Sequence, residues 1–396
     1  MRRRDVLRLF AAGGAAMTLP MLLACSDGED DSSAGADTSP SESTNRSTRD
    51  LRVASNVFPV SLDPDVGFAS FSLMGLGAGE ALTRVTPDMK IEPWLATAIT
   101  QVDPLTWRVS LRPDATFWDG SKVDAAAVKA SFERTLGEMA GAVAFVFPAG
   151  TSFSVNGDDI DITTPVPVGA MLSGLANFYL IVKKVAADGS VVMTGQYRIE
   201  NFVDQQSLTL RSYDAHRDGP ARSPTVRVQR VTDVNSRVLA LQAGDIGLAF
   251  ALLPSQVSQL RAANLKVESF LFGRMNGIIL NNTRPPLDDV KVRQAIAFAI
   301  DRDALVDGVL EGQGKPAYGL ISKDWGFEDA VEVQRFDPEA AARLLDEAGW
   351  AASDDGQRSK DGRNLSFTLT FYKSRAELEP FAIVVRDQLK QVGIDV

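Results

Sequence analysis

The chain has 396 residues and a formal net charge of −10, from 51 acidic and 41 basic side chains. This acidic balance argues against a nucleic-acid partner, because phosphate backbones attract clustered Lys and Arg. The single cysteine, Cys25, excludes an intrachain disulfide, and the single histidine, His216, leaves too few ligands for a His/Cys metal site.

The N-terminus is predicted to be an export leader. Residues 1–8, MRRRDVLR, carry four arginines, and the stretch that follows to Ala24 is almost wholly apolar. A basic segment before a short apolar segment is typical of a secretory leader, and the Gly and Pro residues in this one make a poor membrane-spanning helix. The pair Arg3-Arg4 resembles a twin-arginine export signal, and the general secretory route is the alternative.

The leader ends in Leu-Leu-Ala-Cys at residues 22–25, which resembles the lipobox of bacterial lipoproteins. There a peptidase cuts before the cysteine and the new terminal residue is lipidated, so Cys25 is the expected lipid attachment site. Residues 1–24 are then the signal peptide. Residues 25–50 are mostly small or polar and cannot bury enough apolar surface to offset their ordering entropy, so they are predicted to be a disordered tether.

From residue 51 onward, strand and helix patterns alternate. Residues 106–111 alternate apolar and polar side chains, as a half-buried strand does. Residues 124–136 have helical periodicity and begin at Asp124, a good helix N-cap. Residues 140–170, rich in Gly, Val and Asp, predict no clear element. Further strands are predicted at SLTLRS (207–212), VRVQRV (226–231) and NGIILNN (276–282).

Three helices in the last third of the chain have clear start signals. Asp289, Asp301 and Asp337 each stand immediately before an apolar-periodic segment, where a carboxylate can accept a hydrogen bond from a free backbone N–H. The third segment, FDPEAAARLLDEAGW, also has Pro at the first helical position and Gly349 where the helix should stop.

The end of the chain predicts a parallel crossover. Residues 365–372, LSFTLTFY, alternate like a strand, residues 377–392 have helical periodicity, and residues 394–396 begin what should be another strand. Strand, helix and strand in this order favour a right-handed parallel unit. Because three residues make a poor strand, we expect the chain to be an incomplete version of a longer one.

No motif for chemistry stands out. The glycines from Gly75 have the wrong spacing for a dinucleotide loop, and Pro316 occupies the position where a P-loop needs Ser or Thr. His216 lies in a turn-like segment and is predicted to be a solvated loop residue, and paired carboxylates such as Asp354-Asp355 are predicted to be solvated. We therefore expect no enzyme activity, no cofactor and no metal site.

Several segments resemble the family 5 extracellular solute-binding proteins, which are the oligopeptide-, dipeptide- and nickel-binding components of ABC importers. Residues 103–136 are similar to the family's signature around T-W-x-x-x-L-R, although Ala127-Val128 stands where Asp-Val is usual. Residues 280–306 are the most specific match. The resemblance extends over residues 51–396 and includes SLDP (61–64), GQYRIENFVDQQSLTLRSYD (195–214) and FDPEAAARLLDEAGW (336–350).

The resemblance implies an α/β, two-lobed periplasmic-binding-protein-like fold of type II, in the three-domain peptide-binding variant. It implies an N-terminal lobe at residues 51–274, with an inserted subdomain near 70–190. The second lobe would span residues 275–396 and be incomplete at its C-terminus, where peptide-binding relatives place the acidic residue that holds the free amine. By position in the family, the candidate ligand-binding residues are Ser61, Leu62, Asp63, Arg274, Asn276 and Trp325.

The implied function is that of a substrate-binding lipoprotein, anchored at the outer face of the cytoplasmic membrane, on the cell surface or in the periplasm. It would capture peptides between two lobes and deliver them as a monomer to ABC permease and ATPase subunits. Nickel, haem and sugars are the alternative ligands. The alternative functions are a peptide-sensing or chaperone-like binding protein without transport, or a non-functional truncated paralogue. An exported enzyme lacks a visible nucleophile and base.

Overall fold

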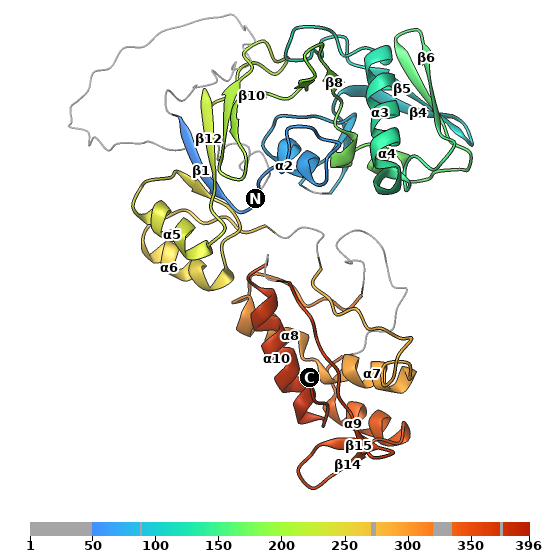
Figure 1. Cartoon of the computed structure of the whole chain (residues 1–396), viewed down its shortest axis with the longest axis vertical. Helices are drawn as coiled ribbons and strands as arrows, with labels where there is room; N and C mark the ends of the chain where they lie inside the picture. The colour runs from blue at the N-terminus through green and yellow to red at the C-terminus, as the bar shows by residue number, and fades with distance from the viewer. Residues whose placement is uncertain (1–49, 88, 271–274, 320–334, 373–374) are drawn as a thin grey trace, which may run out of the picture. The chain divides into compact units, whose positions relative to one another are not determined.

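The computed structural model describes residues 50–87, 89–270, 275–319, 335–372 and 375–396. These residues form two compact units that divide between Phe250 and Ala251 (Figure 1). The predicted leader and tether, with Cys25, lie outside the described residues. Arg274 and Trp325 lie outside them as well. No helix in the described part of the chain is both long and apolar enough to cross a membrane.

A mixed five-stranded sheet organises unit 1, with the strand order β10-β11-β12-β1-β13. Strands β10, β11 and β12 pair antiparallel, whereas β12, β1 and β13 pair parallel. The predicted strands at 207–212 and 226–231 are confirmed. The strands are β1 (Leu51–Ser55), β10 (Tyr197–Val203), β11 (Ser207–Ser212), β12 (Thr225–Arg230) and β13 (Leu248–Ala249).

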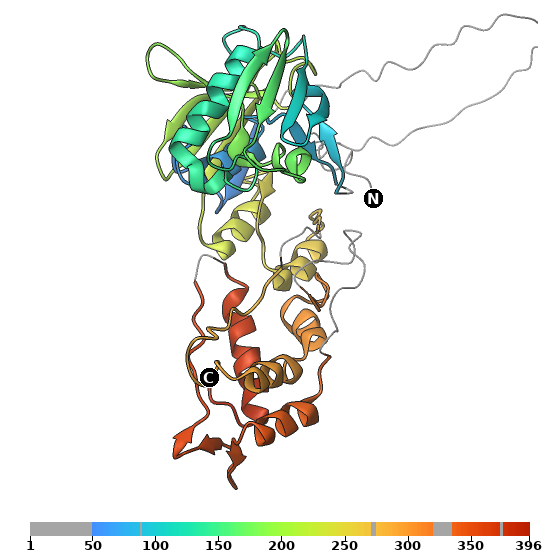
Figure 2. The same ribbon diagram turned by 90° about the vertical axis from the view of Figure 1, so that its right-hand side faces the viewer.

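A second, antiparallel sheet of unit 1 has the order β4-β5-β7-β6 and packs against helix α3 (Figures 1 and 2). Asp124 caps α3 as predicted, since its side chain accepts a hydrogen bond from the N–H of Ala127. Phe132 of α3 packs against Phe147 and Phe153 in the core. The elements are β4 (Ala96–Asp103), β5 (Thr106–Leu111), α3 (Ala125–Val143), β6 (Ser152–Asn156) and β7 (Asp159–Thr163).

The β6–β7 hairpin occupies the stretch for which the sequence predicted no clear element. Its core-facing residues, Ile160 and Ile162, alternate with Asp159 and Asp161. Aspartate is depleted in strands, so composition obscured the alternation. The remaining elements of unit 1 are α2 (Ala69–Gly75), β2 (Thr83–Val85), β3 (Ile91–Pro93), α4 (Met171–Gly174), η2 (Phe178–Leu180), β8 (Lys184–Val185), β9 (Val191–Val192) and α5 (Val234–Gln242).

Unit 2 is mainly helical. Asp289, Asp301 and Asp337 cap α7, α8 and α9, so all three predicted helix starts are confirmed. Gly349 has a φ of 83°, the left-handed conformation expected after α9. The elements are η3 (Pro254–Gln256), α6 (Val257–Ala262), α7 (Val290–Ala299), α8 (Arg302–Val309), α9 (Pro338–Glu347), β14 (Ala351–Ala352), β15 (Arg358–Lys360), β16 (Arg363–Asn364) and α10 (Leu378–Gln391).

Two predicted strands of unit 2 are wrong as continuous strands. Residues 276–282 form no ladder with any described strand, and Ile279 is 98% exposed. Residues 365–372 make only an isolated parallel bridge, in which Phe367 N–H donates to Asp395 O at 3.1 Å. Alternating side chains suit a strand, but a ladder also needs a paired neighbour. The parallel pairing of this segment with the residues after α10 is nevertheless confirmed.

Candidate functional site

The carboxyl edge of the parallel strands in unit 1 is the candidate site. Strands β12, β1 and β13 run in the same direction, so their C-terminal ends and the loops that follow lie at one edge. There the N–H of Val231 donates to Ser55 O at 2.9 Å and the N–H of Phe250 donates to Ala54 O at 3.1 Å. Ligands of open α/β sheets bind outside this edge.

The loop after β1, residues 56–68, contains three of the predicted ligand-binding residues. Ser61 lies in a turn, where its Oγ accepts the N–H of Asp63 at 3.0 Å. Leu62 is half-buried against the core of the five-stranded sheet. The structure thus brings these three residues to the same loop, but only part of their surface is open to a ligand.

The carboxylate of Asp63 is held by a guanidinium from α3. Arg134 donates from Nη1 to Asp63 Oδ1 at 2.9 Å and from Nη2 to Asp63 Oδ2 at 2.5 Å. These hydrogen bonds, the largest influence, keep the pKa of Asp63 below its usual value despite partial burial. Asp63 is therefore ionised and paired at neutral pH, and its direct contact with a ligand stays a prediction.

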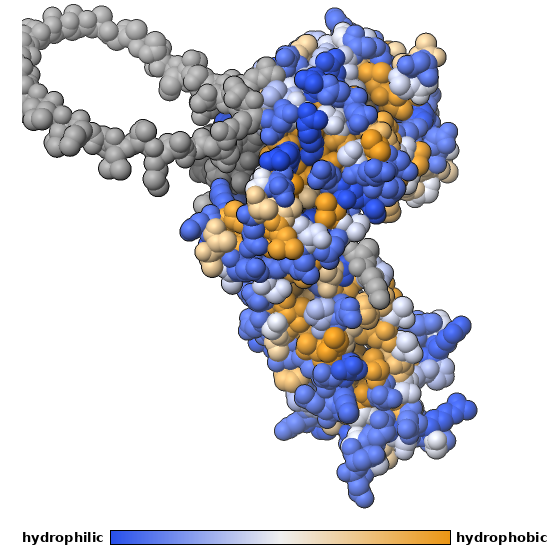
Figure 3. Space-filling view, turned by 60° about the vertical axis from the view of Figure 1, so that its left-hand side comes forward, coloured by the Kyte–Doolittle hydropathy of each residue, from blue (hydrophilic) through white to orange (hydrophobic). Residues whose placement is uncertain are grey.

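Exposed apolar side chains belong to this loop and to the start of α2. Phe68 is 67% exposed, and Val60, Val66 and Phe71 are also exposed. The ring of Phe68 lies 6.1 Å from that of Tyr179, measured between centroids. Exposed aromatic and aliphatic groups beside a few fixed polar groups are typical of small-molecule sites. The face drawn in Figure 3 shows apolar patches within a mostly hydrophilic surface.

Unit 2 contains one further predicted site residue and a separate pocket. Asn276 is exposed in an extended segment. The open pocket has a volume of about 570 Å³, within the range of small-molecule sites, and Asn276 does not line it. Its lining includes Pro254, Val309, Glu377, Glu379, Pro380 and Ile383.

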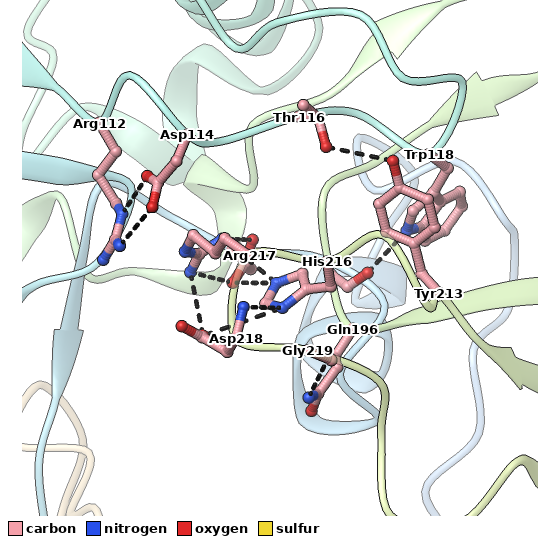
Figure 4. Close-up of polar contacts among 12 residues, drawn as sticks. Arg112, Asp114, Thr116, Trp118, Gln196, Tyr213, His216, Arg217, Asp218 and Gly219 are labelled. Atoms are coloured by element: carbon pink, nitrogen blue, oxygen red, sulfur yellow. Dashed lines mark hydrogen bonds and ion pairs between the residues drawn. The ribbon is translucent and has the colours of Figure 1, made fainter.

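The prediction that His216 is a solvated loop residue is wrong. Its backbone does form a turn, since its N–H donates to Tyr213 O at 3.0 Å, but its side chain is buried. Figure 4 shows the ring of His216 beside the guanidinium of Arg217. The ring Nε2 lies 3.4 Å from Glu80 Oε1, and the neighbouring Arg217 donates to both carboxylate oxygens, at 2.7 and 2.9 Å. We call Glu80, His216 and Arg217 the Glu80 cluster.

The Glu80 cluster is a structural feature of unit 1. Burial, the largest influence, would raise the pKa of Glu80, but the hydrogen bonds from His216 and Arg217 hold it below its usual value. Sequence reasoning missed this cluster. The one sequence feature that could have indicated a buried charge is Glu80, which stands alone among the apolar and small residues 76–82. Within the described ranges, no group of three His, Cys, Asp or Glu side chains could hold a metal ion.

Comparisons with known proteins agree with this fold. Residues 90–396 match the family described as "Bacterial extracellular solute-binding proteins, family 5 Middle". The oligopeptide-binding protein AppA of Bacillus subtilis is 32% identical over 207 residues, which cover 51% of this chain and 38% of that protein. The glutathione-binding protein GsiB of Salmonella paratyphi A is 27% identical over 328 residues, covering 80% of this chain and 62% of that one. The chain thus spans less than two thirds of the length of these curated relatives.

A solved structure gives the same architecture. The crystal structure of NikA from Staphylococcus aureus, in complex with Ni(L-His)2, matches with a TM-score of 0.74 at 24% identity. The match covers 87% of this chain and 72% of NikA. The α/β architecture described above is therefore the fold of these periplasmic binding proteins.

Proposed function

Since the chain belongs to the bacterial extracellular solute-binding proteins of family 5, we propose that it captures peptides and delivers them to the permease of an ABC importer. Members of this family are extracellular or periplasmic binding proteins for transport, not enzymes. The match over residues 90–396 is the observation that carries the proposal. The carboxyl edge of the parallel strands supports it, because this edge is where such sheets bind ligands.

A peptide is the ligand that the described residues favour. The exposed apolar and aromatic side chains of loop 56–68 and of Phe71 suit a ligand with apolar side chains. The one histidine is buried against Glu80, so it does not offer an exposed ring nitrogen to a metal. Two relatives, AppA and GsiB, are named for an oligopeptide and for glutathione, which are both peptides.

A nickel complex is the second candidate ligand. It is favoured by the likeness to NikA, whose crystal structure contains Ni(L-His)2. A peptide-sensing or chaperone-like role without transport, and a non-functional truncated paralogue, are the alternative functions. Genes for a permease and an ATPase beside the gene for this chain would favour import over these alternatives.

The residues proposed to contact the ligand are those that the family resemblance predicted to be near it. In this proposal two lobes, 51–274 with a subdomain near 70–190 and 275–396, close on the peptide by hinge motion. Contacts from side chains and from backbone groups would hold the peptide as an added strand. The contacting residues would be Ser61, Leu62, Asp63, Arg274, Asn276 and Trp325.

A lipid on Cys25 would anchor the protein at the outer face of the cytoplasmic membrane. The lipobox-like Leu-Leu-Ala-Cys at residues 22–25 supports this part of the proposal. Cells fed a labelled fatty acid should label the wild-type chain and leave Cys25→Ser unlabelled. Equal labelling of both chains would contradict the assignment of Cys25.

Native mass spectrometry of the purified chain tests the ligand assignment. We expect a mixed population of short peptides to leave the protein on collisional activation, because such receptors hold peptides in roomy, hydrated pockets. A stoichiometric nickel complex or sugar would overturn the peptide assignment. A chain that carries nothing, and whose Tm does not change with trialanine, glutathione or Ni(L-His)2, would contradict solute binding.

A further inference from the structure

A buried ion pair connects Asp65 of loop 56–68 to Lys183. The side chains of Asp65 and Lys183 are 1% and 0% exposed, and Lys183 Nζ lies 2.6 Å from Asp65 Oδ1. Lys183 Nζ also donates to the hydroxyl of Thr135, which donates to Asp65 Oδ1 at 3.1 Å. Both side chains are therefore removed from water and depend on each other and on the neighbouring side chains for compensation.

Arg134 of α3 extends this pair to the loop surface. Its Nη1 contacts both loop carboxylates, at 2.9 Å from Asp63 Oδ1 and 2.6 Å from Asp65 Oδ2. Two basic side chains thus face two carboxylates, so the formal charges of the group cancel. We call Asp63, Asp65, Arg134, Thr135 and Lys183 the loop-anchoring cluster. Asp65 and Lys183 are 118 positions apart in the sequence, so the cluster joins distant segments of unit 1.

The backbone of the loop is held mainly by its own residues. The N–H of Asp65 donates to Asp63 Oδ1 at 3.1 Å, and the N–H of Val66 donates to Asp63 O at 3.1 Å. The first half of the loop is held by Phe58, which stacks on Phe202 in the sheet core. Among the described residues, the side-chain hydrogen bonds that connect the second half of the loop to other segments come from Asp63 and Asp65.

The energetics of such a cluster favour a role in conformation. Two buried charges lose hydration, so an ion pair adds little stability compared with apolar side chains of the same shape. Removing one partner is nevertheless costly, because the other charge is left uncompensated. A cluster of this kind can restrict its segments to one arrangement. Here the restricted segment, residues 61–68, includes the exposed side chains of Val66 and Phe68.

We propose that Arg134 and Lys183 are positioning residues for the solute site. Through Asp63 and Asp65 they hold residues 61–68 in the arrangement that binds the solute, without contacting the solute themselves. This inference rests on the proposed function, since it assumes that the loop after β1 contributes to the site. The inference adds that the affinity for the solute depends on a cluster within unit 1. The residues of this cluster outside the loop belong to α3 and to the segment before β8.

The test compares Arg134→Met with a matched control in the full chain. The control is Arg108→Met, because Arg108 also makes a bidentate pair with an aspartate, Asp161, at 2.7 and 2.9 Å, but in the four-stranded sheet. Hydrogen exchange followed by mass spectrometry reports on the loop without any ligand. We expect amides of residues 61–68 to exchange at least about tenfold faster in Arg134→Met, and to be unchanged in Arg108→Met.

Binding is measured with three probes: trialanine, glutathione and Ni(L-His)2. For the probe that the wild-type chain binds most tightly, we expect Kd to rise by about tenfold in Arg134→Met, because the apparent Kd increases as the binding-competent fraction of the loop falls. Arg134→Lys keeps a charge but not the bidentate geometry, so it should restore part of the affinity and of the amide protection. If Arg134→Met does not fold, Asp63→Asn should reproduce its faster amide exchange, and the change in Kd is then measured in Arg134→Lys, because Asp63 is itself a proposed ligand contact.

Each result of the exchange and binding measurements either supports or refutes the role of the loop-anchoring cluster. Unchanged exchange at residues 61–68 in both Arg134→Met and Asp63→Asn would overturn the proposal. Faster exchange with unchanged Kd would show that the cluster holds the loop but does not position the solute site, and would also overturn it. A wild-type chain that binds none of the probes would refute the proposed function instead, and the exchange data would still decide whether Arg134 holds the loop.

Discussion

Replacing Glu80 by Gln tests whether the Glu80 cluster stabilises unit 1. The side chains of Glu80 and Arg217 are 4% and 3% exposed, and the two form a bidentate pair at 2.7 and 2.9 Å. Gln has nearly the same shape but no charge, so the buried Arg217 guanidinium would keep only the exposed carboxylate of Asp218, which lies 3.8 Å away. Breaking a buried pair in this way costs about 3–5 kcal/mol. For a unit of this size, that corresponds to a decrease in Tm of roughly 6–20 °C.

The measurement is thermal unfolding at pH 7, with a surface pair as the control. Glu200 and Arg211 lie 2.6 Å apart with side chains 40% and 50% exposed, so Glu200→Gln should hardly change Tm. A double-mutant cycle with Arg217→Met separates the pair from the effect of each side chain alone. If Glu80→Gln lowers Tm no more than Glu200→Gln, the argument that burial makes this pair important is wrong.

The same variant has a signature in pH dependence. The folded-state pKa of Glu80 lies below its ordinary value of 4.5, so the folded state binds the proton less readily than the unfolded state. The stabilisation is therefore complete above about pH 4.5 and is lost as the pH falls through the folded-state pKa. The stability of wild type should fall in this acid range, and the stability difference between wild type and Glu80→Gln should shrink there. A difference that stays constant from pH 7 to pH 3 would contradict the assignment of this shift to Glu80.

Three further substitutions probe the fold itself. Phe132→Ala should lower the free energy of unfolding, measured in urea, by about 3–5 kcal/mol, because Phe132 is fully buried against two other rings and its removal leaves a cavity. A decrease below about 1 kcal/mol would contradict that packing. Asp337→Ala should lower the free energy of unfolding by about 1 kcal/mol in the same assay, because Asp337 Oδ1 accepts the N–H of Ala340 at 2.8 Å. Asp337→Asn should retain most of that stability. Gly195→Ala should give little folded protein on expression, because an added Cβ would lie 2.2 Å from Gly77 O; a normally folded variant would show that the two backbone segments can separate.

The sequence predicted those features whose cause lies within a few residues. A carboxylate at Asp289 or Asp337 satisfies an N–H two or three positions later, so the start of each helix could be predicted without tertiary information. Strands β11 and β12 were predicted because their apolar residues alternate and both face a core. Residues 276–282 have a similar composition but no pairing neighbour among the described residues, and that difference is not encoded locally.

The site could be predicted only in part. The family resemblance directed attention to Ser61, Leu62 and Asp63, and the structure places them in the loop at the carboxyl edge of β1. It could not show that the carboxylate of Asp63 is held by Arg134, 71 positions later in the chain. His216 illustrates the same limit, because its local sequence predicts a turn and its partner, Glu80, lies 136 positions earlier.

The two clusters that the sequence did not reveal both lie in unit 1 and connect segments that are distant in the sequence. Asp63 and Asp65 connect the loop after β1 to Arg134 and Lys183, and Glu80 connects the segment beyond α2 to Arg217. Apolar packing alone would tolerate small shifts of these segments, whereas a buried charge must keep its partner within hydrogen-bond distance. A binding site gains affinity when its loops are already held in the bound arrangement, because ordering them then costs less free energy on binding. In the proposed role the loop-anchoring cluster therefore pre-organises the loop after β1, whereas the Glu80 cluster contributes mainly to the stability of unit 1.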